Sequence, residues 1–359
     1  MKKGSFFPIS KLIRYFTRAI SERTVLKKII KDNQKFLMPG KYRVTATNGK
    51  KIIYLNDNLT ENFLKNNVMH LSKQKPAYLK VIIKGVVRNL LTISNSKNMS
   101  SEDFKGSLLM ITRNHDIRIF DFMEKRSLVI LTNKSKLRKL YSNYEDFSKY
   151  FSIPKTCFNL EKLSYTEEYL EFTPYNLWGL SDKERVVKEI FSSYKKYFEA
   201  TKKIKKSATL KTEHLFYEFQ KKVDHRSLVN LIREILIKTT HNETRWPLVN
   251  QHGDLGYHNI LLSKSNCYII DWEDSNEYVF FYDILNYFYT SRNMDCYFRG
   301  EIDDKLSELF QIFNMDYDRE SRMLYFIVFI MQRSIWEVQI NPFPKEILNR
   351  VCLIIEDNR

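Results

Sequence analysis

The sequence feature that most constrains the fold of this chain is a pair of short segments, residues 252–259 and 269–273, which read HGDLGYHN and IIDWE. Two apolar runs, residues 260–262 and 267–270, lie on either side of a polar turn at residues 263–266. Short apolar runs around a polar turn are typical of a β-hairpin. Such a hairpin folds the chain back on itself, so it predicts that Asp271 lies close to Asn259.

Three side chains in these segments have the chemistry that phosphoryl transfer requires. The reaction needs an acid near the attacking hydroxyl and oxygen ligands that hold Mg²⁺ against the phosphates. Asp254 supplies a carboxylate in a turn where Gly253 allows the backbone to fold tightly. Asn259 and Asp271 supply side-chain oxygens at the two ends of the predicted hairpin, where both could bind one metal ion.

These segments resemble the signature of the aminoglycoside phosphotransferase and choline kinase family, a group of small-molecule kinases with a protein-kinase-like fold. The family pattern runs H-G-D-x-x-x-x-N, then hydrophobic residues, then I-D-[FW]-[EG]. The resemblance implies that Asp254 orients or deprotonates the acceptor hydroxyl, and that Asn259 and Asp271 bind Mg²⁺. It also implies ATP as the phosphate donor, with His252 and Asp283 as residues that support the loop.

The same segments argue against a protein as the acceptor. Protein kinases have Arg where this chain has Gly253, and their metal-binding aspartate begins D-F-G ahead of an activation segment. Here Asp271 is followed by Trp272 and Glu273, and a predicted helix begins by about Asp283. This gap is too short for a peptide-docking segment. We therefore expect a small polar acceptor with a hydroxyl group: a sugar, an amino alcohol such as choline, or an aminoglycoside-like glycoside.

The order of predicted elements indicates an α+β protein with the bilobed protein-kinase-like fold. Strands are predicted at residues 107–112, 117–122 and 127–132, then a helix at 136–150, then strands at 156–159 and 166–172. Helices are predicted at residues 182–203, 228–238, 282–289, 303–313, 320–338 and 344–355. The expected domains are a basic N-terminal extension over residues 1–100, a small antiparallel-sheet lobe over 101–173, and a larger helical lobe over 174–359.

The nucleotide-binding part of the resemblance is weaker. The predicted turn at residues 113–116 contains no glycine, and the third predicted strand contains no lysine. Lys125 and Arg126 precede that strand and Lys134 follows it. We take Lys134 and, on the next helix, Glu145 as the candidate nucleotide-binding pair; a solvated surface position is the alternative. The same departure leaves open a second function, a catalytically weak or inactive kinase-fold protein that acts as a binding or assembly module.

The formal net charge of +17 is concentrated near the N-terminus, because residues 1–50 contain thirteen basic and only two acidic residues. Within them, residues 9–37 place apolar side chains at helical spacing between cations, which predicts a basic amphipathic helix. One interpretation is a helix packed on the body of the protein. The other is peripheral contact of residues 1–40 with an anionic membrane or another acidic partner. No nucleic-acid-binding motif accompanies the charge, so we expect no nucleic-acid partner.

The remaining features predict a cytoplasmic protein. The N-terminus lacks the continuous apolar run of a secretory signal, and the four cysteines stand far apart with no CxxC pair. The longest apolar run, residues 323–331, is too short to cross a bilayer. We therefore expect no disulfide framework and no transmembrane segment, with a position at the inner membrane surface if residues 1–40 bind lipid.

Overall fold

The computed structural model describes residues 23–47, 50–55, 57–67, 92–95, 104–112, 114–204, 208–238, 244–340 and 351–355. The predictions for residues 1–22 and for most of the helix at 344–355 lie outside these ranges, although residues 351–355 are helical. The chain divides into two compact units, residues 1–138 with 154–170 and residues 139–153 with 171–359.

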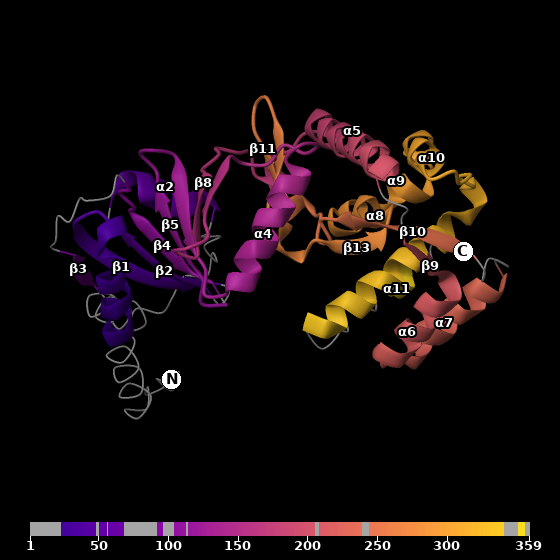
Figure 1. Ribbon diagram of the computed structural model, residues 1–359, viewed down its shortest axis with the longest axis horizontal. Coiled ribbons are helices and arrows are strands. Elements are labelled where there is room, and N and C mark those ends of the chain that lie inside the picture. Colours follow the sequence, from indigo (N-terminus) through magenta and orange to yellow (C-terminus); the bar gives the residue numbers. More distant parts are fainter. Residues whose placement is uncertain are drawn as a thin grey trace, which may run out of the picture. The chain divides into compact units, whose positions relative to one another are not determined.

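The first unit is built on an eight-stranded antiparallel sheet, drawn from indigo to magenta in Figure 1. Its strands are β1 (Gly40–Thr47), β2 (Lys50–Leu55), β3 (Ile93–Asn95), β4 (Leu108–Ile111), β5 (Ile117–Asp121), β6 (Arg126–Ile130), β7 (Thr156–Asn159) and β8 (Ser164–Glu168). Their order is β3-β1-β2-β4-β5-β6-β8-β7. With α4 (Lys134–Phe147) between β6 and β7, the segment from β4 to β8 has the predicted order of three strands, a helix and two strands.

Three strands of this sheet come from the N-terminal extension that the sequence places before residue 101. β1 pairs with β2 and β3, and β2 pairs with β4, so the sheet begins at Gly40. The sequence contains a short β-like run at residues 51–55, which lies in β2, but it does not show that this strand is covered on both faces. Ile52 and Ile53 are both fully buried, so its apolar residues are consecutive and do not alternate with polar ones.

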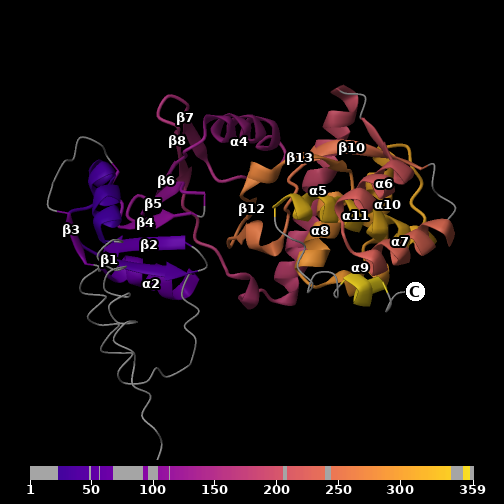
Figure 2. The same ribbon diagram turned by 90° about the horizontal axis from the view of Figure 1, so that it is seen from below.

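Helical segments pack on the two faces of this sheet, which Figure 2 shows from a second direction. Leu26 and Ile30, from the helical residues 23–32, belong to the core on one face. Leu64 of α2 (Asn58–Asn67) belongs to the core on the other. The described part of the basic amphipathic segment is thus a helix with one face packed on the body of the protein, and contact of its exposed lysines with an anionic surface stays a prediction.

The second unit is mainly helical. Its helices, besides the end of α4, are α5 (Leu180–Ile204), α6 (Thr212–Lys222), α7 (Arg226–Lys238), α8 (Tyr282–Thr290), α9 (Met294–Phe298), α10 (Asp303–Ile312) and α11 (Arg322–Ile340). Its strands are β9 (Thr209–Lys211), β10 (Arg245–Gln251), β11 (Ile260–Leu262), β12 (Cys267–Ile269) and β13 (Asn276–Val279). β13, β10 and β9 form a three-stranded sheet, and β11 and β12 form a hairpin. A sheet-based unit and a mainly helical unit confirm the predicted α+β, kinase-like fold.

Helix α11 runs through the core of the second unit. Every residue from Leu324 to Met331 is at least 95% buried, and the core around this helix is rich in aromatic side chains. Among the described residues, no helix combines the length and the apolar character needed to span a membrane.

Candidate active site

The hairpin of β11 and β12 brings the two motif segments together, as the sequence predicts. Ile260 pairs with Ile269, and the amide of Ile270 donates a hydrogen bond to the main-chain oxygen of Asn259 at 3.0 Å. Asp271 is the next residue after Ile270. The backbone of this turn therefore holds Asp271 beside Asn259.

Asn259 is in turn bonded to Asp254. Its Nδ2 donates to the main-chain oxygen of Asp254 at 2.9 Å and to the carboxylate Oδ2 at 3.3 Å. Both bonds use Nδ2, so they do not consume the amide oxygen of Asn259, which is the atom suited to a metal. Asn259 is buried, Asp254 is partly buried, and Asp271 is exposed. The three residues selected from the motif therefore lie in one short stretch of structure.

Asp271 has a left-handed backbone conformation, with φ 68° and ψ 51°. Aspartate adopts this region more readily than most residues with a Cβ atom. The turn leads from β12 into a short 3₁₀ helix, Trp272–Asp274, whose tryptophan stacks on Phe147 with ring centroids 4.2 Å apart. Asn143 also donates to the main-chain oxygen of Trp272 at 2.7 Å. Packing and hydrogen bonding of Trp272 thus fix the backbone that carries Asp271.

Asp283, at the start of α8, bonds to the backbone at the beginning of the motif. Its Oδ2 accepts from the amide of His252 at 2.7 Å, and its Oδ1 accepts from the amide of Gly253 at 3.0 Å. The hydroxyl of Tyr194 also donates to this fully buried carboxylate. Burial raises the pKa of Asp283, while the charge of His252 and the hydrogen bonds from Tyr194 and the two amides act in the opposite direction.

The ring of His252 connects Asp254 to the end of β12. Its Nδ1 accepts from the amide of Asp254 at 3.2 Å, and its Nε2 lies 2.8 Å from the main-chain oxygen of Ile270. The ring is fully buried, with its centroid 4.7 Å from that of Trp272. His252 therefore links the two motif segments directly.

The carboxylate of Asp254 is stabilised in its ionised form. Burial raises its pKa, but the hydrogen bond and charge of His258, together with the charges of Arg333 and His252, outweigh burial and lower the pKa below its ordinary value. His258 Nε2 lies 3.2 Å from Asp254 Oδ2. A carboxylate with a low pKa accepts a hydrogen bond from a hydroxyl group and orients it.

Acidic side chains are concentrated around the motif. Burial is the main cause of the raised pKa of Asp274, and the charges of Glu273, Asp254 and Asp271 add to it. A divalent cation would relieve this repulsion. The described residues contain no group of three or more His, Cys, Asp or Glu side chains arranged to hold a metal. A Mg²⁺ ion held by Asn259 and Asp271 would take its other oxygen ligands from phosphates and water, as this ion commonly does.

Several polar residues that are connected to the loop of Asp254 belong to no motif in the sequence. Arg333 on α11 forms an ion pair with Glu337 at 2.7 Å and donates a hydrogen bond to Asn286 on α8. Asn286 donates to the main-chain oxygen of Leu255 at 3.0 Å. The sequence did contain a signal: Arg333 comes two residues after the apolar stretch at 323–331, and a charge in a buried helix requires a partner.

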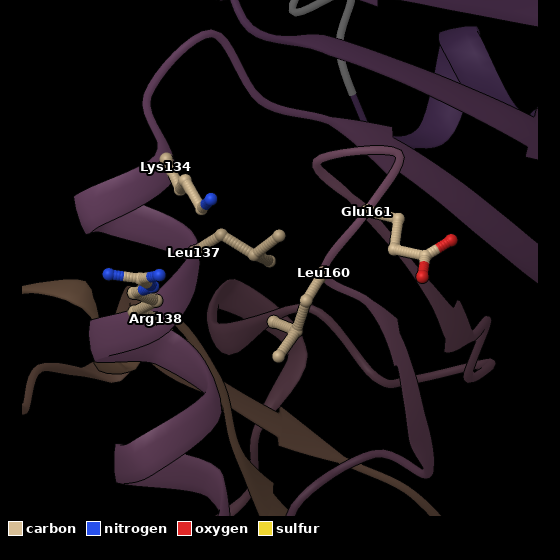
Figure 3. A pocket seen from close by; sticks show the side chains of 5 residues that line it. All are labelled: Lys134, Leu137, Arg138, Leu160 and Glu161. Carbon is tan, nitrogen blue, oxygen red and sulfur yellow. The ribbon is translucent and has the colours of Figure 1, made fainter.

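The candidate nucleotide-binding pair lies on a single helix. Lys134 is the first residue of α4 and Glu145 the third from its end, about 16 Å apart along the axis at 1.5 Å per residue. Both side chains are exposed, and this distance is too long for an ion pair between them. Lys134 lines a cavity of about 190 Å³ together with Leu137, Arg138, Leu160 and Glu161. Figure 3 shows these side chains. The nucleotide-binding role of Lys134 and Glu145 stays a prediction.

The turn between β4 and β5, where a phosphate-covering loop is expected, is tied to the start of α4. Asp116 in this turn forms an ion pair with Lys136 Nζ at 3.0 Å. Its Oδ1 also accepts from the amide of Thr132 at 3.1 Å and from the hydroxyl of the same residue at 3.3 Å. Lys136 is a basic residue of this region that the sequence reasoning did not select.

Comparisons with known proteins give structural matches alone: no protein-family model matches this sequence, and neither does any curated protein. The choline kinase LicA from Streptococcus pneumoniae is 16% identical, with a TM-score of 0.44 over 78% of this chain and 98% of that one. A choline/ethanolamine kinase family protein from Mesorhizobium loti is 12% identical, with a TM-score of 0.40 over 62% and 75%. The amicoumacin kinase hAmiN, in complex with AMP-PNP, Ca²⁺ and Ami, is 12% identical, with a TM-score of 0.43 over 68% and 85%.

These structural neighbours are small-molecule kinases, of the group that the motif resembles. Because the identities are low and the TM-scores lie below 0.5, the roles of individual side chains are argued from the motif and the contacts of this chain.

Proposed function

We propose that this protein is a small-molecule kinase that uses ATP and Mg²⁺ to phosphorylate a hydroxyl group of a small polar acceptor. One observation carries the proposal: Asn259 is hydrogen-bonded to Asp254 on one side and, through its main chain, to the residue before Asp271 on the other. This arrangement supports a site in which the carboxylate serves the acceptor and the oxygens of Asn259 and Asp271 serve a metal. Phosphoryl transfer depends mainly on such positioning and on charge neutralisation.

In the proposed reaction, Asp254 accepts a hydrogen bond from the acceptor hydroxyl. Asn259 and His258 both bond to its Oδ2, which leaves Oδ1 for the acceptor. As the hydroxyl oxygen forms a bond to the γ-phosphorus of ATP, the bond from that phosphorus to the β–γ bridging oxygen breaks, and ADP leaves. The hydroxyl proton passes to Asp254. Asn259 and Asp271 would hold Mg²⁺, which when bound neutralises charge on the phosphates.

The charges around the site bear on the acceptor. Asp254, Asp271 and Glu273 lie close enough to Asp274 for their charges to raise its pKa, after the larger effect of burial. Like charges of this kind disfavour an anionic acceptor. The acceptor classes predicted from the sequence, a neutral sugar, an amino alcohol such as choline, or an amino-sugar glycoside, are all compatible with this charge.

A second candidate function is a kinase-fold protein that binds its ligands but turns them over weakly. One observation favours it: β6 contains no lysine, and its basic residue, Arg126, forms an ion pair with Asp121 at 3.4 Å. The strand position from which a lysine would reach the nucleotide phosphates is therefore occupied by other side chains. Binding without turnover would be the signature of this second function.

Thermal unfolding with and without ATP and Mg²⁺ tests the site. We expect the two together to raise the melting temperature of the wild type, and the Asp271→Ala variant to lose most of this increase. Asp304→Ala is the matched control, because Asp304 is 95% exposed on α10 and has no place in the motif. Absence of any increase in the wild type would contradict nucleotide binding at this site.

Turnover separates the two candidate functions. ADP formation is measured with choline, ethanolamine and an aminoglycoside such as streptomycin as acceptors, for the wild type and for Asp254→Asn. Acceptor-dependent ADP formation that the variant loses supports the kinase. Stabilisation by ATP without ADP formation on any acceptor, in a panel extended to free sugars, favours the binding protein.

A further inference from the structure

A chain of buried polar side chains connects helix α11 to the loop that carries Asp254. It begins with the ion pair of Glu337 and Arg333, whose side chains are only 10% and 11% exposed. Arg333 Nη1 then donates to Asn286 Oδ1. Asn286 is fully buried on α8, and its Nδ2 donates to the main-chain oxygen of Leu255 at 3.0 Å. The chain thus extends from the second half of α11 to the main-chain oxygen of Leu255, the residue that follows Asp254.

We propose that Arg333 is a positioning residue for the proposed phosphotransfer, and that it acts through Asn286 on the backbone beside Asp254. This inference rests on the function proposed above. The main-chain oxygen of Asp254 is held by Asn259, and the next one, of Leu255, is held by Asn286. The orientation of Asp254 therefore depends on two amide side chains, one of which is itself fixed by Arg333.

An arginine at this place is not explained by stability alone. A buried ion pair contributes little net stability, because desolvation of the two charges offsets their attraction. Here two polar atoms of the pair, Arg333 Nε and Glu337 Oε2, are buried without a hydrogen-bond partner. Each such atom costs free energy. The ion pair leaves these two atoms without hydrogen bonds, and it still fixes the amide of Asn286. This combination fits a positioning role better than a purely stabilising one.

The proposal makes Asn286 the decisive position. An aspartate there keeps an oxygen for Arg333 but loses the Nδ2 donor to Leu255, so Asn286→Asp breaks the link to the loop, and the charge that it adds lies next to the guanidinium of Arg333. Arg333→Met breaks the link to α11. We expect each to lower kcat by about 10- to 100-fold with KM for ATP changed less than about threefold, because small misplacements of a catalytic group have effects of this size. The double variant should lose less kcat than the product of the two single losses, since both substitutions break one chain, although Arg333→Met also removes a charge that lowers the pKa of Asp254.

Arg322→Met is the matched control. The substitution removes the ion pair between Arg322, on the same helix, and the largely buried Asp303. Within the described part of the chain, neither residue forms a hydrogen bond to residues 254–259. We expect a lower melting temperature and an unchanged kcat. Arg333→Lys, which retains the charge, should recover part of the kcat lost in Arg333→Met. Equal kcat in the Arg322, Arg333 and Asn286 variants would overturn the proposal.

Hydrogen exchange of residues 254–259 provides a readout that needs no acceptor. The Asn286→Asp and Arg333→Met variants should exchange these amides several-fold faster than the wild type, while Arg322→Met should not. If the wild type phosphorylates no acceptor, the proposed function fails, and exchange alone decides whether Arg333 positions the loop. If the wild type is active and all three variants exchange alike, the positioning role fails on its own.

Discussion

Asp283 Oδ2 accepts a hydrogen bond from the backbone amide of His252 at 2.7 Å, across thirty-one positions of sequence. The other oxygen of the same carboxylate accepts from the next amide, that of Gly253. Two acceptors on one side chain thus satisfy two adjacent backbone donors in the interior of the protein, where water cannot replace them. This is the contact by which α8 holds the beginning of the motif.

Replacement of Asp283 is therefore expected to destabilise the second unit. Asp283→Ala leaves both amides buried without an acceptor, so we expect the free energy of unfolding to fall by about 3 kcal/mol or more. Asp283→Asn retains one acceptor oxygen and should lose about half as much. Urea denaturation measures both, with the exposed Asp304→Ala as control, expected within about 0.5 kcal/mol of the wild type. Equal stability of the alanine variant and the control would contradict the anchoring role.

Two glycines of the motif should differ in how they tolerate a methyl group. Gly253 has φ 85°, and a Cβ there would lie 2.6 Å from the main-chain oxygen of Asp274. At Gly256 the obstacles are side-chain atoms, including His258 Cε1 at 2.6 Å. Backbone cannot move aside as a half-exposed histidine can. We therefore expect Gly253→Ala to cost about 3 kcal/mol and Gly256→Ala about 1 kcal/mol in free energy of unfolding.

The double variant Gly256→Ala with His258→Ala checks the physical reason. If the imidazole is the obstacle, removing it should restore most of the stability lost in Gly256→Ala, so the two substitutions will not be additive. Chemical denaturation of the two single variants and the double variant gives this comparison. Additive losses would show that His258 is not the main obstacle and would point to the hydroxyl of Thr290, which a Cβ at Gly256 would meet at 2.9 Å.

The part of the site that the sequence predicts is the part held by local contacts. Asn259 and Asp271 are joined by a hairpin whose two strands and turn are all visible in the residues between them. The bond from Asn286 to Leu255 joins different elements, and so does the bond from Arg333 to Asn286. Neither residue has a recognisable spacing to its partner, so only the fold could show the contact.

The fold shows the same distinction. The strands from β4 to β8 have polar turns and apolar runs that mark them in sequence, whereas β1 has no such mark and the β-like run of β2 lies among lysine- and asparagine-rich residues. β2 is recognisable as a central strand only once helical residues 23–32 and α2 are seen on its two faces. Tertiary packing, which periodicity does not report, determines its structure.

The basic helix at residues 23–32 predicts a membrane contact that can be tested without unfolding the sheet. Leu26 and Ile30 are buried, while Lys27, Lys28 and Lys31 are exposed. We propose that these lysines contribute to binding of an anionic surface, each by about 1 kcal/mol. Replacing all three by Gln should weaken flotation with phosphatidylserine vesicles and leave the melting temperature unchanged. Equal flotation of the triple variant and the wild type would dismiss their contribution.

The acids around Asp254 predict a pH-dependent change in stability. Because the pKa of Asp274 is raised, chiefly by burial and then by neighbouring acids, the folded protein keeps a proton on Asp274 at pH values where the unfolded chain has lost it. Between the ordinary and the raised pKa of Asp274, the stability of the folded protein therefore falls as the pH rises.

Asp274→Asn mimics the protonated form, so in metal-free buffer we expect its melting temperature to exceed that of the wild type by about 1–3 °C at pH 7. The difference should vanish below pH about 4, where the carboxyl is protonated in both states. A melting temperature below that of the wild type at pH 7 would show that Asp274 is stabilised by a partner and is not repelled by its neighbours.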